Sequence, residues 1–400
     1  MNPLRRRWLR ALALAPWCAG ANGPALDAEA AAGTPSGASP GAIAATAGSA
    51  RTDAEVDPVR RGRVLAFPRD HGAHLGARTE WWYATGWVGA SAAGGPGETP
   101  SHGFQVTFFR SRTGLAADNP SRFAARQLLF AHAAVTDLRV RRHHHDQRIA
   151  RWSGAPRSAL GWASTEDAEV RLGSWSLRRD GDIWRSVVEA GSFRLDLAQQ
   201  RTQPLLLQGD AGFSRKGPEE RQASHYYSEP QLAATLRLAL DDRPAGAPGM
   251  GRGWIDHEWS DEILHPEAVG WDWIGINLFD GGALTAFVLR RRDGSPLWAG
   301  GSFRAPGQPA RIFAADEVRF QPGRRWLSPQ TAASYPVQWQ VSTPAGRWQV
   351  QALMDEQELD SRGSTGTVYW EGLSELLDGA GRRVGLGYLE MTGYAGALRL

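Results

Sequence analysis

The 400-residue chain contains one cysteine, Cys18, and one lysine, Lys216. A single cysteine excludes an intramolecular disulfide, so packing and hydrogen bonds alone must hold the fold. Lys216 is the only lysine among 45 lysine and arginine residues, so the pI of about 9.3 reflects arginine. The net charge is only +3, and the basic residues are scattered rather than gathered with aromatic residues. Both features argue against a nucleic-acid-binding protein.

Long apolar runs and helical periodicity are also missing. The apolar run Ala11–Ala15 is too short to span a bilayer. Helical spacing of apolar residues is hardly sustained over about twelve residues at any point. From about residue 58 onward, short alternating segments such as Gly103–Phe109 and Ser192–Leu197 are separated by Gly, Pro, Asp and Asn. This pattern predicts an all-β protein built as a sandwich or barrel.

The N-terminal segment has the features of an export signal. Arg5–Arg7 precede the apolar run and the small residues that follow it, which predicts a signal peptide over residues 1–21 of the Sec or twin-arginine type. The alternative is a disordered basic tail. We expect an exported protein, periplasmic or secreted. Lipid anchoring at Cys18 is not expected, because Trp17 stands where a small residue would be needed.

Composition also divides the remaining chain. Residues 22–57 consist largely of Ala, Gly, Ser, Pro and Thr without periodicity, which predicts a flexible linker. The turn-rich stretch 241–249 separates two patterned halves. We therefore expect an N-terminal barrel over 58–240 and a C-terminal barrel over 250–400, each long enough for one closed barrel.

One acid interrupts an aliphatic strand face. Alternation in the segment Gly270–Leu278 places Trp271 and Trp273 on one face, and Asp272 on the other face with Ile274. An acid in such a row conflicts with the binary pattern, and such conflicts mark functional sites. If this face lines a barrel interior, burial raises the pKa of Asp272 and makes it a candidate general acid. The alternative is that Asp272 caps a strand or pairs with an arginine.

A histidine lies between two acids in the segment Trp254–Ser260. Alternation groups His257 with Trp259, and Asp256 with Glu258. His257 could orient an acid, relay a proton or hold a water molecule, or it could be a hydrogen-bonded core residue. No second histidine stands at metal-ligand spacing and no cysteine is available, so we expect no metal site.

Glu80 is the matching acid of the first half, and it shares a strand face with Trp82. We interpret it as a buried carboxylate that is hydrogen-bonded across the interface between the halves. Elsewhere, the glycine-rich segment Gly209–Gly217 lacks the order of a phosphate loop. Ser224–Ser228 lacks the Gly-x-Ser-x-Gly turn that would support hydrolase chemistry.

Eight ordered motifs carry a resemblance to a known family. They are Thr79–Tyr83, Gly103–Arg110, Ala131–Asp137, Gly212–Gly217, Ser224–Ser228, Trp254–Ser260, Gly270–Gly275 and Gly387–Tyr394. From about residue 60 to 400 the chain resembles the AttH-type lipocalin-like proteins, often labelled predicted secreted hydrolases. These are related to carotenoid 1,2-hydratases, also called hydroxyneurosporene synthases. The resemblance implies two lipocalin-like antiparallel barrels packed together.

The resemblance also implies a reaction. The related hydratases add water to an isolated C=C bond of an acyclic carotenoid without a cofactor. Similarity to their Asp-His-x-Trp segment points to His257 and Trp259, and their essential aspartate falls most plausibly at Asp272. Asp272 would then be the acid, Trp259 would stabilise the cation, and His257 would position water. The expected ligand-binding residues are Trp271, Trp273, Asp256, Glu80 and Trp82.

Three functions follow in order of preference. The first is an exported, cofactor-independent hydratase acting on an apolar isoprenoid or lipid-like molecule. The second is a non-enzymatic carrier of a hydrophobic ligand in the same aromatic cavity. The third is a secreted hydrolase, which ranks last because no nucleophile constellation is visible. The expected partner is a hydrophobic small molecule, and peripheral membrane association stays open.

Overall fold

The computed structural model describes residues 58–89, 100–115, 119, 121, 123–241, 243–262 and 264–398. The predicted signal peptide and linker, residues 1–57, lie outside the described residues. Strands dominate, and the helical content is one short 3-10 helix, η1 (Arg69–His71), among the described residues. No helix in that part of the chain is long and apolar enough to cross a membrane.

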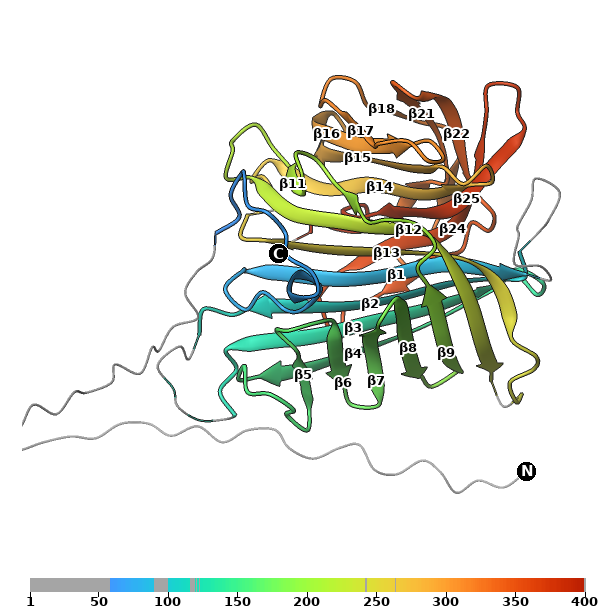
Figure 1. The fold of residues 1–400 in the computed structure, drawn as a ribbon. Helices are drawn as coiled ribbons and strands as arrows, with labels where there is room; N and C mark the ends of the chain where they lie inside the picture. The colour runs from blue at the N-terminus through green and yellow to red at the C-terminus, as the bar shows by residue number, and fades with distance from the viewer. Residues whose placement is uncertain are drawn as a thin grey trace, which may run out of the picture. The chain divides into compact units, whose positions relative to one another are not determined.

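The first sheet has thirteen antiparallel strands in the order β4-β3-β2-β1-β13-β12-β9-β8-β7-β6-β5, with β10 and β11 added to β12 (Figure 1). Their bounds are β1 (Thr79–Gly89), β2 (His102–Arg112), β3 (Gln127–Asp137), β4 (Arg142–Trp152), β5 (Gly161–Ala163), β6 (Glu169–Leu172), β7 (Trp175–Asp180), β8 (Ile183–Glu189), β9 (Phe193–Gln200), β10 (Leu206–Leu207), β11 (Phe213–Arg215), β12 (Ala223–Leu240) and β13 (Gly249–Ser260). The edge strands β4 and β5 come into contact, so the sheet is a nearly closed barrel.

The second sheet has ten strands in the order β17-β16-β15-β14-β25-β24-β22-β21-β18, with β23 added to β24. Their bounds are β14 (Ala268–Leu278), β15 (Ala283–Arg291), β16 (Pro296–Arg304), β17 (Arg311–Phe313), β18 (Arg319–Pro322), β21 (Gln338–Thr343), β22 (Gly346–Ala352), β23 (Glu358–Asp360), β24 (Val368–Leu377) and β25 (Arg383–Met391). Strands β19 (Arg325–Leu327) and β20 (Ser334–Pro336) form a separate pair.

Strand β13 belongs to the first sheet, where it lies between β1 and β12 (Figure 1). The chain therefore passes to the second sheet between Ser260 and Ala268, later than the predicted boundary at 241–249. The turn-rich stretch connects two neighbouring antiparallel strands, β12 and β13, which is also what such a composition favours. As a result, Asp256 and His257 lie in the first sheet and Asp272 in the second.

Three hydrophobic clusters explain the layering. One fills the first barrel and includes Trp82 and Phe104. A second lies inside the second sheet and includes Ile274 and Ile276. A third takes side chains such as Trp273 from strands of both sheets. Side chains alternate along a strand. Each central strand can therefore place the side chains of one face in a barrel interior and those of the other face in the junction between the sheets. This confirms the predicted all-β, lipocalin-like fold.

Candidate functional site

A pocket of about 280 Å³ lies where the two sheets face each other. Its walls come from alternate side chains of β1, β2, β3, β12 and β13 on one side and of β14, β15, β24 and β25 on the other. About half of the lining residues are aromatic or aliphatic, including Trp81, Trp271 and Trp273, and most of the exposed lining surface is apolar. A concave, largely apolar pocket with a few converging polar groups is the usual form of a small-molecule site.

The first sheet contributes two rows of side chains to the pocket. Asp256 on β13 lies opposite Tyr83 on β1, and two residues further on Glu258 lies opposite Trp81. On its other side, Glu258 lies opposite Tyr226 of β12. Residues two apart on a strand point to the same face. Both carboxyls of the segment Asp256–Glu258 therefore enter the pocket, while His257 points away.

The second sheet contributes two further carboxyls. Glu371 on β24 and Glu390 on β25 are directly opposite each other, and Glu390 also lies opposite Trp273 of β14. Glu371 is buried. Glu390 is partly accessible from the pocket, although its carboxyl is enclosed by protein. Four acidic side chains thus converge in a largely apolar space.

Asp256 is buried and accepts three hydrogen bonds. The donors are Trp254 Nε1 at 2.8 Å, Ser228 Oγ at 2.5 Å and the Tyr226 hydroxyl at 2.9 Å. Burial nevertheless raises the pKa of Asp256 to about 7, because the hydrogen bonds offset only part of the desolvation and the charge of Glu258 adds to it. Asp256 therefore keeps its proton for part of the time at neutral pH.

Burial also raises the pKa of Glu371, and the facing charge of Glu390 adds to the effect. The pKa of Glu390 rises in turn through burial and through the charges of Asp256 and Glu258 across the junction. Two carboxyls so close together in a dry site cannot both ionise easily. Glu371 Oε1 and the Tyr83 hydroxyl are both buried and lie close enough for each to shift the pKa of the other, although no hydrogen bond of normal geometry joins them.

An ion pair lies beside these acids. Lys216 Nζ is 2.9 Å from Glu258 Oε1 and donates to Ser214 Oγ at 2.8 Å. The Ser224 hydroxyl also donates to Glu258. The pocket therefore combines a carboxylate with a fixed cation and carboxyls without one. Enzymes assign acid and base roles to neighbouring carboxyls by giving them different environments, as here.

Of the residues predicted from the sequence, Asp256, Trp271 and Trp273 line this pocket. Asp272 lies on the opposite face of β14, as its strand parity predicted, and is absent from the pocket wall. It is fully buried, its Oδ2 is 2.6 Å from Arg290 Nε, and the Tyr394 hydroxyl donates to it at 3.0 Å. Burial raises the pKa of Asp272 to about 6, against the opposing charge of Arg290. Its catalytic role stays a prediction.

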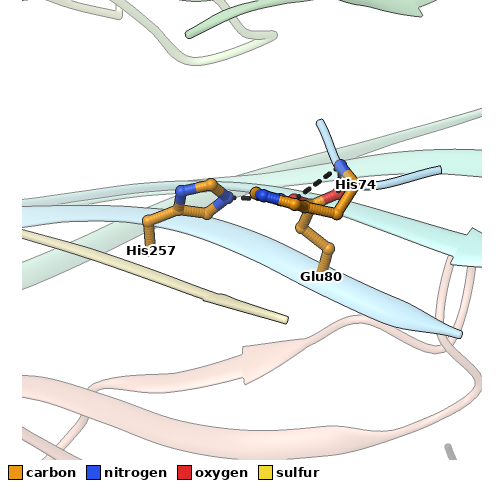
Figure 2. Close-up of side chains that lie close together, drawn as sticks. All are labelled: His74, Glu80 and His257. Atoms are coloured by element: carbon orange, nitrogen blue, oxygen red, sulfur yellow. Dashed lines mark hydrogen bonds and ion pairs between the residues drawn. The ribbon is translucent and has the colours of Figure 1, made fainter. Parts of the chain in front are cut away.

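The other predicted residues, Glu80, Trp82, His257 and Trp259, lie on the faces of β1 and β13 that turn away from the pocket. There His74, from the segment after η1, joins them (Figure 2). His74 Nδ1 is 2.7 Å and His257 Nε2 is 3.0 Å from the same oxygen, Glu80 Oε1. Glu80 is thus buried and hydrogen-bonded, but within the first barrel rather than across the interface. The predicted roles of these residues in catalysis and binding stay predictions.

The ligand atoms of His74, Glu80 and His257 lie within 4.8 Å of one another, close enough for a metal ion. However, Arg110 Nε is 2.7 Å from Glu80 Oε2, and the second nitrogen of His74 is 3.0 Å from Asp70 Oδ1. The donor atoms are already engaged, and a buried guanidinium beside the site would repel a dication. The geometry favours a hydrogen-bonded ion network.

Ring packing extends the same network. Trp259 stacks on His74 with ring centroids 3.6 Å apart, and Trp82 stacks on His257 at 4.8 Å. The Trp82 Nε1 donates to the carbonyl of His71 at 2.9 Å. These contacts fix the segment around η1 against β1 and β13. They give Trp82 and Trp259 a structural role.

Sequence reasoning missed Lys216, Glu258, Glu371 and Glu390 as pocket residues. Two signals were available. Lys216 is the only lysine of the chain. In the second half, alternation groups Glu371 with Tyr369 and Glu390 with Tyr388, so each acid shares a strand face with an aromatic residue.

A solved structure described as an AttH from Nitrosomonas europaea is 43% identical, covers 84% of this chain and 99% of its own, and has a TM-score of 0.75. Kievitone hydratase from Nectria haematococca is 14% identical over 83% of this chain and 94% of its own, with a TM-score of 0.60, a likeness of fold alone. No curated protein matches the chain. The sequence profile of the AttH-like family matches residues 58–394, in agreement with the resemblance inferred from the motifs. The chain therefore belongs to the AttH-like family.

Proposed function

We propose that the protein is a hydratase that adds water to a C=C bond of an apolar, isoprenoid- or lipid-like substrate bound between the two sheets. One observation carries the proposal. Asp256, Glu371 and Glu390 converge in an aromatic pocket, and burial keeps protons on them near neutral pH. The fold shared with kievitone hydratase adds support by analogy only.

Hydration needs a proton donor and a proton acceptor at opposite ends of one double bond. The acid transfers its proton to one carbon, the oxygen of water bonds to the other carbon, and a base takes the released proton. Asp256 is the acid, because its pKa is raised to about 7, and a general acid is most effective when its pKa lies near the pH of the reaction. Glu258 is the base, because it is the acid of this pocket that has a cationic partner, Lys216, at 2.9 Å.

The pocket walls suit the cationic character that develops when an alkene is protonated. Trp81, Trp271 and Trp273 line the pocket beside the acids. An indole face attracts a desolvated cation by about 2 kcal/mol and does not trap it covalently. The acid that gives up its proton becomes a carboxylate, and this carboxylate adds negative potential in a site of low polarity. Such a pocket stabilises a carbocation better than it stabilises the neutral alkene.

The proposal is tested by incubating the purified protein with a panel of acyclic isoprenoid alkenes in ¹⁸O-labelled water. We expect an alcohol product that carries the labelled oxygen. Asp256→Asn should lower the rate by about 10²–10⁴-fold, the usual contribution of a general acid. The exposed loop carboxyl of Glu166 supplies the matched control, Glu166→Gln. Unchanged turnover in Asp256→Asn would remove Asp256 from the mechanism.

The second candidate is a carrier of a hydrophobic ligand, in the periplasm or outside the cell if the predicted export occurs. It is favoured by the full set of hydrogen bonds around Asp256, which suits a static wall as well as an acid. Mass spectrometry of protein purified under native conditions would identify a bound apolar molecule. A carrier would bind that molecule equally well as Asp256→Asn and would show no turnover.

A hydrolase has less support from the pocket. The hydroxyls of Ser224 and Ser228 donate to Glu258 and Asp256. A serine nucleophile needs a base that orients and deprotonates it, most often a histidine. His257, the histidine between these two acids, points to the other face of β13.

A further inference from the structure

Lys216 is the single lysine of a chain whose other long basic side chains are all arginine. It directly follows β11, and its side chain is buried in the wall of the pocket between the sheets. The neighbouring Arg215 instead donates to the backbone carbonyls of Gly217 and Pro218, outside the pocket wall. Lysine provides a compact point charge with three donors, whereas arginine provides a wide planar fork.

The ammonium of Lys216 has a donor to spare. It donates a hydrogen bond to Ser214 Oγ at 2.8 Å, and Nζ lies 2.9 Å from Glu258 Oε1 as an ion pair. The nitrogen also lies 4.8 Å from the ring centre of Tyr226 and 4.4 Å from that of Phe287. Among the described residues no third oxygen accepts from it. A buried charged donor without an acceptor is costly, so a ligand oxygen placed there would be bound strongly.

The remaining polar groups of the pocket make this position distinctive. The other charged side chains in the wall are acids, which repel a substrate oxygen unless they are protonated. Lys216 is the only lysine or arginine among the lining residues of the described chain. The Tyr83 hydroxyl, which lies beside Glu371, is a neutral donor in the same wall. An acceptor oxygen in the substrate therefore has one charged anchor in this pocket.

We propose that Lys216 determines specificity by donating a hydrogen bond to an oxygen of the substrate, so that the substrate is an apolar molecule bearing a carbonyl oxygen rather than a pure hydrocarbon. The inference rests on the proposed use of this pocket as the substrate site. The anchored oxygen fixes the position of the chain along the pocket. The double bond is then presented to the carboxyls beyond Glu258.

The test compares two probes with one carbon skeleton, geranylacetone and its deoxygenated counterpart 2,6-dimethylundeca-2,6-diene, by titration calorimetry. The informative variant is the double change Lys216→Met with Glu258→Gln, which leaves no unpaired buried charge. We expect the affinity for the ketone to fall by about 10-fold or more, the size of a charge-assisted hydrogen bond. Affinity for the hydrocarbon should stay within about twofold, which also shows that the pocket is intact. The single change Lys216→Met should give the same selective loss.

Equal effects on both probes, or no loss for the ketone, would overturn the inference, as would failure of the wild type to bind either probe. A failure of the proposed function would give a different combination of results. A selective loss of ketone binding in a protein that never incorporates labelled water would support Lys216 as the anchor and reject the hydratase. Labelled product that depends on Asp256, together with equal effects on both probes, would reject the anchor alone.

Discussion

Strands β1 and β13 carry two groups of buried acids on opposite faces, and the two groups differ in their partners. On the barrel side, Glu80 has Arg110, His74 and His257 within hydrogen-bond distance. On the pocket side, Asp256, one residue before His257, has only neutral donors. Burial works against both charges, but the pKa of Glu80 falls well below its usual value while that of Asp256 rises. A charged partner decides whether a buried acid stabilises the fold or holds a proton for chemistry.

The largest effect is expected from Glu80→Gln. The substitution leaves the guanidinium of Arg110 fully buried without its carboxylate. Breaking a buried ion pair from one side costs about 3–5 kcal/mol. Urea unfolding at pH 7 should show this loss in the free energy of unfolding. The matched control is Glu371→Gln in the pocket, where the carboxyl is already held neutral by its raised pKa, so little or no stability should be lost. Equal losses in the two variants would show that the two groups of acids do not differ as described.

The next effect concerns how the free energy of unfolding depends on pH. The barrel-side acids and the pocket-side acids should change it in opposite directions. The pKa values of Glu80 and Asp70 are lowered on folding, so their stabilisation is complete above the unfolded value of about 4 and is lost as pH falls. The pKa of Asp256 is raised to about 7, so its contribution is present below about pH 4 and is lost as pH rises through 7. Among the surrounding groups, His132 stays neutral because burial lowers its pKa to about 3, and Glu371, Glu390, Glu258 and Lys216 share the pocket.

Asp256→Asn should therefore gain stability relative to the wild type as pH rises. We expect a difference near zero at pH 4 and about 2–4 kcal/mol at pH 8, since each unit of pKa shift corresponds to about 1.4 kcal/mol. Urea unfolding at a series of pH values measures it, with Glu166→Gln as the control that should show no trend. A constant difference across the series would mean that Asp256 is ionised throughout. The rate of hydration should decline above about pH 7 for the same reason.

A smaller effect on stability is expected at Asp272, whose environment combines features of Asp256 and Glu80. Its pKa is raised to about 6, yet it has a cationic partner in Arg290 and lies outside the pocket wall. We expect Asp272→Asn to cost about 1–3 kcal/mol of stability, because Arg290 loses its carboxylate. Turnover should fall less than in Asp256→Asn. The opposite order of turnover would support Asp272 as the acid, as the sequence predicts, and would place the reaction inside the second barrel.

The sequence predicted the strand faces, but not which face meets the ligand. Alternation correctly separated Asp256 from His257 and Trp271 from Asp272. An acid in an aliphatic row looked like the reactive one, whereas the aromatic face of β14 lines the pocket. That choice depends on how two sheets pack, which is set by contacts between distant strands.

His74 illustrates a second limit of sequence reasoning. It lies in an irregular segment without a motif, and only the tertiary fold brings it to Glu80 and His257. The turn-rich stretch at 241–249 likewise has the same composition whether it joins two barrels or two strands of one sheet. Local patterns could not distinguish these cases, because both need the same turn residues.

The smallest expected effects concern two tryptophans that lie on opposite sides of the β1–β13 pair, Trp259 of β13 and Trp273 of β14. Trp259 stacks on His74 in the ion network, whereas Trp273 lines the pocket and donates to the Tyr226 hydroxyl at 3.2 Å. Trp259→Phe should lower the free energy of unfolding by about 1 kcal/mol and leave the affinity for geranylacetone unchanged. Trp273→Phe should weaken that affinity about fivefold, because part of an aromatic contact to the ligand is lost. Calorimetry suits both measurements, since tryptophan fluorescence itself changes in these variants. If Trp259→Phe weakened ligand binding more than Trp273→Phe did, the ligand would have to reach the barrel face of β13, and the cation-stabilising role predicted for Trp259 would be supported.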